Sequence, residues 1–109
     1  MVMPYGKKSI KNWYEFMGER NCLGCGTWPV QMAHIRLLVS FKTQAMLPRR
    51  EGINEWAVIP LCPDCHMTRT DSIHNVGETR WMENNEWTQE KLLRWWTSLF
   101  LEWFTTGGR

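Results

Sequence analysis

Apolar residues recur at helical spacing near both ends of the chain. From Ile10 they fall at i, i+3, i+4 and i+7, which predicts a helix over residues 9–18 with Ser9 as its N-cap. A broader stripe predicts a second helix over residues 88–105 with Thr88 as its cap, and its apolar members are Leu92, Leu93, Trp95, Trp96, Leu99, Phe100, Trp103 and Phe104. Because this stripe is wider than a small core needs, part of it is a candidate homodimer surface or a platform beneath the cysteine-containing middle of the chain.

The middle of the chain has a different pattern. Residues 30–35 alternate enough for a short strand that ends near His34, and residues 55–60 are rich in aromatic and β-branched side chains, which predicts a second strand stopped by Pro60. Pro63 and Asp64 suit the first turn of a following helix. Residues 37–54 follow no clear pattern, and we expect a mobile loop there.

Composition bounds the kinds of protein this chain can be. Its 109 residues predict a single domain, and 8 Trp give it a heavy aromatic load. A net charge of only +2 excludes a strong global field, so any attraction to nucleic acid must come from local clusters. No apolar run approaches the ~20 residues of a membrane span, and the first eight residues lack the apolar run of a secretory signal, which predicts a cytoplasmic protein.

All four cysteines lie in two Cys-x-x-Cys pairs, Cys22 with Cys25 and Cys62 with Cys65. Two such pairs predict one tetrahedral site for a structural zinc ion. The tight turn of the first pair needs small or positive-φ residues, which Gly24 and Gly26 supply. A redox dithiol is the alternative, but the βαβ context is missing and a second pair is present.

Zinc binding at both pairs would bring His34, His66 and His74 close together. A lone histidine is usually a hydrogen-bonded structural residue, whereas its place between two metal-binding turns favours function for His34. Eight residues of straight helix span ~12 Å, which is too far for His66 and His74 to bind one ion directly. A helix break near Asp71 would remove that conflict, so the sequence leaves open whether His74 folds back or continues the helix.

The order of strand with terminal histidine, loop, strand, Cys-x-x-Cys-His and helix resembles the HNH endonucleases, also called ββα-metal nucleases. The resemblance covers about residues 21–80, and the combination of motifs is most similar to the phage recombination-associated branch of the Ref type. Its motifs are Cys-Leu-Gly-Cys-Gly at 22–26, Ala-His-Ile-Arg at 33–36, Ile-Pro-Leu-Cys-Pro-Asp-Cys-His at 59–66 and Ile-His at 73–74.

The resemblance implies an α+β fold, a small zinc-stabilised ββα-metal module of treble-clef-like form flanked by N- and C-terminal helices. It also implies DNA hydrolysis in a bacterial or phage-infected host cell. His34 would be the general base that activates water, and His66 would hold a catalytic divalent metal (Mg²⁺, Mn²⁺, Ni²⁺ or Zn²⁺) at the scissile phosphate. His74 would be a further ligand or would orient the phosphate. An ordinary imidazole, with a pKa near ~6.5, can take the proton of water at physiological pH.

Two positions depart from the family pattern. Many HNH sequences place Asp or His just before the base histidine as a metal ligand, and here that residue is Ala33. Ala57 occupies the commonest position of the middle Asn, so Asn54 is only a loose candidate for that role. The residue that orients the base is therefore unassigned.

Basic side chains near these motifs could bind DNA phosphates. Arg36, Arg69 and Arg80 lie close to the motifs in sequence, and the loop adds a basic tip formed by Lys42, Arg49 and Arg50. The alternative for the tip is a solvated charged loop.

Three other functions compete with cleavage. A non-catalytic zinc-stabilised nucleic-acid-binding module would use the same four thiolates. A zinc deaminase is disfavoured because Leu61, not Pro, precedes Cys62 and because the residues after His34 lack the His-x-Glu motif. A protein-interaction adaptor would use the Trp-rich C-terminal helix, and this role is compatible with cleavage.

Overall fold

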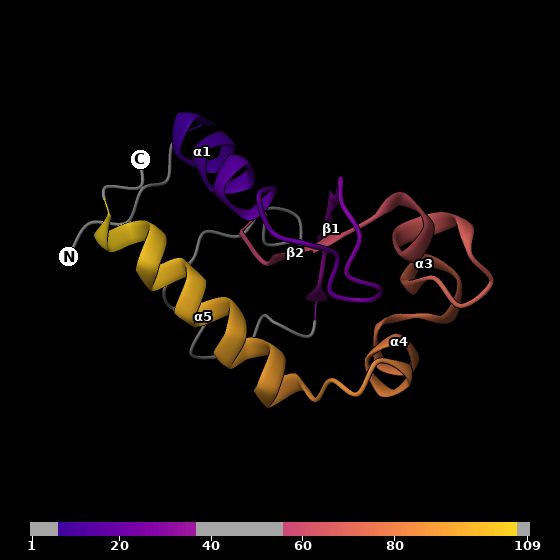
Figure 1. Cartoon of the computed structure of the whole chain (residues 1–109). Helices are drawn as coiled ribbons and strands as arrows, with labels where there is room; N and C mark the ends of the chain where they lie inside the picture. The colour runs from indigo at the N-terminus through magenta and orange to yellow at the C-terminus, as the bar shows by residue number, and fades with distance from the viewer. Residues whose placement is uncertain (1–6, 37–55, 107–109) are drawn as a thin grey trace.

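The computed structural model describes residues 7–36 and 56–106, which form a small α+β protein with four α-helices, a π-helical turn and a two-stranded sheet (Figure 1). The elements follow in the order α1 (Lys7–Met17), β1 (Gln31–His34), β2 (Val58–Leu61), η2 (Asp64–Thr68), α3 (Ile73–Val76), α4 (Glu78–Asn84) and α5 (Gln89–Thr105). Figure 1 shows α1 and α5 to one side of the sheet and α3 with α4 to the other. The basic loop with Lys42, Arg49, Arg50 and Asn54 lies outside the described residues.

Strands β1 and β2 pair antiparallel, with His34 opposite Val58 and Gln31 opposite Leu61. The second strand begins later than predicted and contains Pro60, which the sequence analysis expected to end it. The Pro60 carbonyl accepts the Leu23 amide at 3.0 Å, so this residue turns its polar backbone away from β1. Proline has no backbone N–H, but at this position the N–H would point away from β1, so no hydrogen bond between the strands is lost and β2 tolerates Pro60.

An aromatic cluster joins α1 to α5. The Trp13 ring lies edge-on to the rings of Trp96 and Phe100, with centroids 5.7 and 5.4 Å apart. The indole N–H groups of Trp13 and Trp96 both donate to the backbone carbonyl of Trp56, at 3.0 and 3.1 Å. Such aromatic pairs contribute ~0.5–1.5 kcal/mol each beyond their buried area. The cluster therefore fixes α1 against α5 and against the residue just before β2.

Helix boundaries agree with the sequence at one end of the chain and not at the other. Thr88 caps α5 as predicted, because its side chain accepts the Lys91 amide. The first helix begins at Lys7, so Ser9 lies inside it and is not the N-cap. Lysine is a good helix former, and two lysines extend the helix past the polar residue that the periodicity marked as its start.

The apolar stripe of α5 divides into a buried and a partly buried set. Leu92, Trp96, Phe100 and Trp103 are buried in the core. The remaining members pack against that core and are partly exposed, namely Leu93, Trp95, Leu99 and Phe104. Much of the stripe thus serves packing within the chain, and a homodimer through α5 stays a prediction.

The segment after the second cysteine pair turns twice within a few residues. Pro63 precedes a π-helical turn, η2, where the sequence suggested an α-helix, and the Arg69 amide donates to the Asp64 carbonyl at 3.0 Å. The chain then breaks, and a new helix, α3, begins with Ser72 as its cap. The break removes the obstacle of one straight helix and places His74 on a separate element from His66.

None of the helices within residues 7–36 and 56–106 combines the length and apolar character that crossing a membrane demands.

Candidate metal centre and histidine pocket

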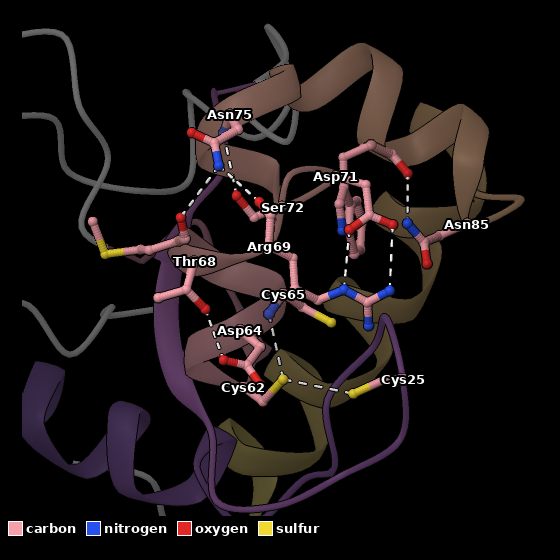
Figure 2. Close-up of polar contacts among 12 residues, drawn as sticks. Cys25, Cys62, Asp64, Cys65, Thr68, Arg69, Asp71, Ser72, Asn75 and Asn85 are labelled. Carbon is pink, nitrogen blue, oxygen red and sulfur yellow. Dashed lines mark hydrogen bonds and ion pairs between the residues drawn. The ribbon is translucent and has the colours of Figure 1, made fainter.

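The sulfur atoms of Cys22, Cys25, Cys62 and Cys65 all lie within 4.8 Å of one another. The Cys25 and Cys62 sulfurs are 3.5 Å apart, and Figure 2 shows this contact as a dashed line. Four sulfurs bound at ~2.3 Å around a zinc ion lie ~3.8 Å from each other. The donor set and its spacing fit such an ion, so this group could hold a metal ion such as zinc.

Each cysteine pair folds its own backbone around its first sulfur. The amides of Gly24 and Cys25 lie 3.3 and 3.4 Å from the Cys22 sulfur, and the Cys65 amide lies 3.4 Å from the Cys62 sulfur. These N–H groups point positive charge at the thiolates and orient them. Gly26 completes the first turn with a φ of 80°, a value that favours glycine.

Gly24 is required for a second reason, which is close packing between the two cysteine pairs. A Cβ atom added at Gly24 would lie 3.0 Å from the Cys65 sulfur and 3.5 Å from the Trp81 ring. The first turn can therefore approach the second only because this position carries no side chain.

The thiols differ in how readily they lose a proton. The Thr27 hydroxyl, 3.0 Å from the Cys25 sulfur, lowers the pKa of Cys25 to about 6 by donating to the thiolate. Burial raises the pKa of Cys65 above its ordinary value, and contacts with the other thiols reinforce that shift. A metal ion that binds all four sulfurs as thiolates must therefore displace protons, chiefly from the buried side of the site.

Arg69 lies beside the cysteine group and not beside the histidines. Its guanidinium pairs with Asp71 through Nε and Oδ1 at 3.0 Å, as Figure 2 shows. Asp71, followed by the negative charge of Cys65, raises the pKa of Arg69. Arg69, Asp71, Cys25 and Cys65 all border a small cavity of about 80 Å³. Arg69 thus lies next to the thiols, and its assignment to DNA phosphate stays a prediction.

His34, His66 and His74 line one open pocket of about 500 Å³. They come from three elements: the end of β1, the π-helical turn η2 and the short helix α3. Arg36, Glu78 and Thr79 are the other polar residues of its wall. Three separate turns of the chain thus bring the predicted site histidines to one place.

Two of the imidazoles are held by side chains from β1 and α1. His66 Nδ1 lies 2.9 Å from Gln31 Oε1, and because a carbonyl oxygen only accepts, Nδ1 carries the proton and Nε2 the lone pair. His34 Nε2 lies 3.3 Å from the Tyr14 hydroxyl. Burial, followed by the nearby charges of His74 and His34, lowers the pKa of His66, which favours its neutral, metal-binding form.

The pocket differs from the cysteine site in one respect. In the part of the chain that the structure describes, the four cysteines are the only group of three or more His, Cys, Asp or Glu side chains placed so that they could hold a metal ion. The three histidines are therefore neighbours around a cavity and do not form a closed ligand set. The pocket volume of about 500 Å³ is large enough for water and a substrate group.

The other sequence-predicted residues divide by position. Arg36 lines the pocket, and its backbone amide donates to Glu78 Oε2 at 2.9 Å. Arg80 is exposed and lies 3.8 Å from Glu83 on the next turn of its own helix. Ala33 and Ala57 are buried and offer no polar side chain.

Three residues of the site were missed in the sequence. Gln31 and Tyr14 had been assigned to a strand and to the core face of a helix, and Glu78 lay beyond the motifs. Glu78 is the first residue of α4, directly after Gly77 with its φ of 87°, and a glycine at this position was the only local signal.

Comparisons with protein-family models, curated proteins and solved structures find no match for this chain.

Proposed function

We propose that this protein is a metal-dependent DNA endonuclease that hydrolyses phosphodiester bonds and is similar to the HNH, or ββα-metal, nucleases of the Ref type. The observation that carries the proposal is the meeting of His34, His66 and His74 around one pocket, beside a four-cysteine group suited to structural zinc. The sheet followed by the Cys-x-x-Cys-His turn would serve as the treble-clef-like module of such a nuclease.

The roles follow from the positions of the ring nitrogens. His66 offers Nε2 to a catalytic divalent metal because Gln31 holds its Nδ1 proton. His74, which lines the same pocket from α3, would serve as a second ligand or orient the phosphate. His34, at the end of β1, takes the proton of the attacking water. A divalent ion bound there supplies charge neutralisation on the phosphoryl oxygens and assistance to the leaving oxygen.

Arg36 and Glu78 complete the arrangement. Arg36 places a guanidinium, always positive at neutral pH, on the pocket wall where a phosphate would enter. Glu78 accepts the Arg36 amide and so fixes the chain directly after His34 and Ile35. Arg36→Gln should weaken DNA binding, whereas Arg94→Gln, which removes an equal charge from the exposed face of α5, should have no effect.

Plasmid nicking tests the activity. The zinc-loaded protein should nick supercoiled DNA with Mg²⁺, Mn²⁺, Ni²⁺ or added Zn²⁺, and His34→Ala should lower the single-turnover rate by ~10²–10⁴ while keeping zinc content and DNA affinity. A His34→Ala variant as fast as the wild type would exclude His34 as the base.

A non-catalytic zinc-stabilised nucleic-acid-binding module is the second candidate. Two observations favour it: Ala33 supplies no metal ligand, and the histidine donor atoms do not close into one ligand set among the described residues. Absence of nicking with every divalent metal, together with retained DNA binding, would establish this candidate instead.

A further inference from the structure

A tyrosine from helix α1 contacts the histidine that the proposed reaction uses as its base. The Tyr14 hydroxyl lies 3.3 Å from His34 Nε2, and the two rings meet edge to face with centroids 6.5 Å apart. The residues lie 20 positions apart in sequence, and Tyr14 is outside the stretch that resembles the nuclease family. The contact therefore belongs to the tertiary structure of this chain.

The contact has a consequence for the protonation of His34. A neutral imidazole carries its proton on one ring nitrogen and a lone pair on the other, and its hydrogen bonds select between the two forms. If Nε2–H donates to the Tyr14 oxygen, Nδ1 keeps the lone pair and can accept a proton from water. If the hydroxyl donates to Nε2, Nδ1 carries the proton and the ring cannot act as a base.

The proposed reaction requires the first form. His34 lines the pocket, whereas Tyr14 is not among the residues of the pocket wall. The tyrosine thus engages the imidazole from the side of α1. Proton transfer from water needs a lone pair on the nitrogen that Tyr14 does not engage, which is Nδ1.

We propose that Tyr14 is the positioning residue of His34, which holds the Nε2–H form and aims Nδ1 at the substrate water. The inference, including the choice of tautomer, rests on the proposed nuclease function, because a base that acts on water must keep its lone pair on the nitrogen that Tyr14 does not engage. Tyr14 would perform the task of the middle Asn in the resembling family, for which Ala57 has no suitable side chain.

The packing of α1 makes Tyr14 suitable for this task. The preceding residue, Trp13, is fully buried and donates its indole N–H to the Trp56 carbonyl at 3.0 Å. Helix α1 is therefore anchored to the residue that precedes Ala57 and β2. Because β2 pairs with β1, the same anchor fixes Tyr14 relative to His34.

The test compares Tyr14→Phe with the wild type, since phenylalanine keeps the ring and removes only the hydroxyl. The first readout is ¹⁵N NMR of the imidazoles in the full-length, zinc-loaded protein, where three histidines make assignment simple. We expect the Nε2–H form of His34 in the wild type and a mixture of forms in Tyr14→Phe. A wild-type His34 with its proton on Nδ1, or a tautomer unchanged by Tyr14→Phe, would overturn the inference.

The second readout is the single-turnover nicking rate. Tyr14→Phe should lower it by about 3- to 10-fold, the worth of one neutral hydrogen bond, with unchanged DNA affinity. In a His34→Ala background Tyr14→Phe should have no further effect, because the hydroxyl acts only through His34; an equal loss in both backgrounds would indicate a merely structural role and overturn the proposal. Glu15→Gln, on the exposed face of the same helix, is the matched control and should leave both readouts unchanged.

The two readouts separate the inference from the function on which it rests. If the wild type nicks no DNA but the tautomer responds to Tyr14→Phe as expected, the nuclease proposal fails while Tyr14 still sets the protonation of His34. If the wild type nicks DNA and Tyr14→Phe changes neither rate nor tautomer, the nuclease proposal stands and the positioning role of Tyr14 is excluded.

Discussion

Adding one methyl group at Gly24 should disturb the metal centre although all four cysteine ligands are kept. In Gly24→Ala the new Cβ would lie 3.0 Å from the Cys65 sulfur and 3.4 Å from the Cys65 Cβ. The sulfur would have to retreat by a few tenths of an ångström to restore an ordinary contact. Metal–ligand distances hold within about 0.2 Å, so a bound Cys65 cannot move that far without weakening its bond.

The size of the effect follows from the clash. Overpacking by one methyl group in a tightly packed site destabilises by about 1–3 kcal/mol. If that energy acts on the metal-bound state, the apparent Kd for zinc rises by roughly 5- to 150-fold. Competition with a chromophoric chelator at constant pH measures this change. Substitution of Co²⁺ for zinc adds a spectrum that reports directly on tetrahedral geometry.

Gly77→Ala is the matched control. Gly77 has a φ of 87°, and an added Cβ there meets nothing within 4 Å. With a ψ of 163°, Gly77 has a conformation that essentially only glycine adopts, so alanine costs about 1–3 kcal/mol of backbone strain and lowers the stability of the protein without adding a contact to a sulfur. Gly77→Ala should therefore keep the wild-type Co²⁺ spectrum, and Gly24→Ala should not. If both variants keep the spectrum and lose zinc affinity equally, the loss reflects general destabilisation, and the steric reasoning at Gly24 is refuted.

Three further predictions concern protonation, ligand orientation and DNA binding. Thr27→Val removes the hydroxyl that holds the pKa of Cys25 at about 6, so this pKa should rise. Zinc affinity at pH 7 should then fall by about 3- to 10-fold, and the difference from the wild type should shrink as the pH rises through 9. Identical pH profiles of zinc affinity for the variant and the wild type would contradict this. Gln31→Ala frees His66 Nδ1, and the metal concentration for half-maximal nicking should rise by about 10- to 100-fold at unchanged DNA affinity; an unchanged metal requirement would rule out the orienting contact. Neutralising Lys42, Arg49 and Arg50 of the basic loop should weaken DNA binding equally on every DNA sequence and flatten its salt dependence. An unchanged DNA affinity would mean that these three residues are only a solvated charged surface.

The sequence was informative wherever a feature depends on residues close together in the chain. The two Cys-x-x-Cys pairs predict a four-sulfur group because a turn of fixed length sets the distance within each pair. Thr88 was identifiable as a cap because capping joins residues three apart. Helix geometry showed that one straight helix would separate His66 and His74 too far, but the sequence left open whether the helix breaks, and the structure supplied that break.

Local rules failed where two signals at one position conflict. Ser9 looked like a cap, yet the lysines before it already continue the helix. Pro60 looked like the end of a strand, yet its polar backbone faces Leu23, where the missing N–H does not affect pairing with β1. Neither outcome can be read from propensity, because each depends on what lies beside the residue in space.

The tertiary structure alone decided which side chains hold the histidines. Tyr14 and His34 lie 20 residues apart, and Gln31 and His66 lie 35 apart. Periodicity assigned Tyr14 to the apolar face of its helix, and its ring does pack there; only the fold determines that its hydroxyl reaches an imidazole. A sequence pattern reports which face of an element is buried, whereas hydrogen bonds between distant elements depend on how those faces pack. The orientation of the proposed catalytic groups is therefore a property of the packing of α1, β1 and η2.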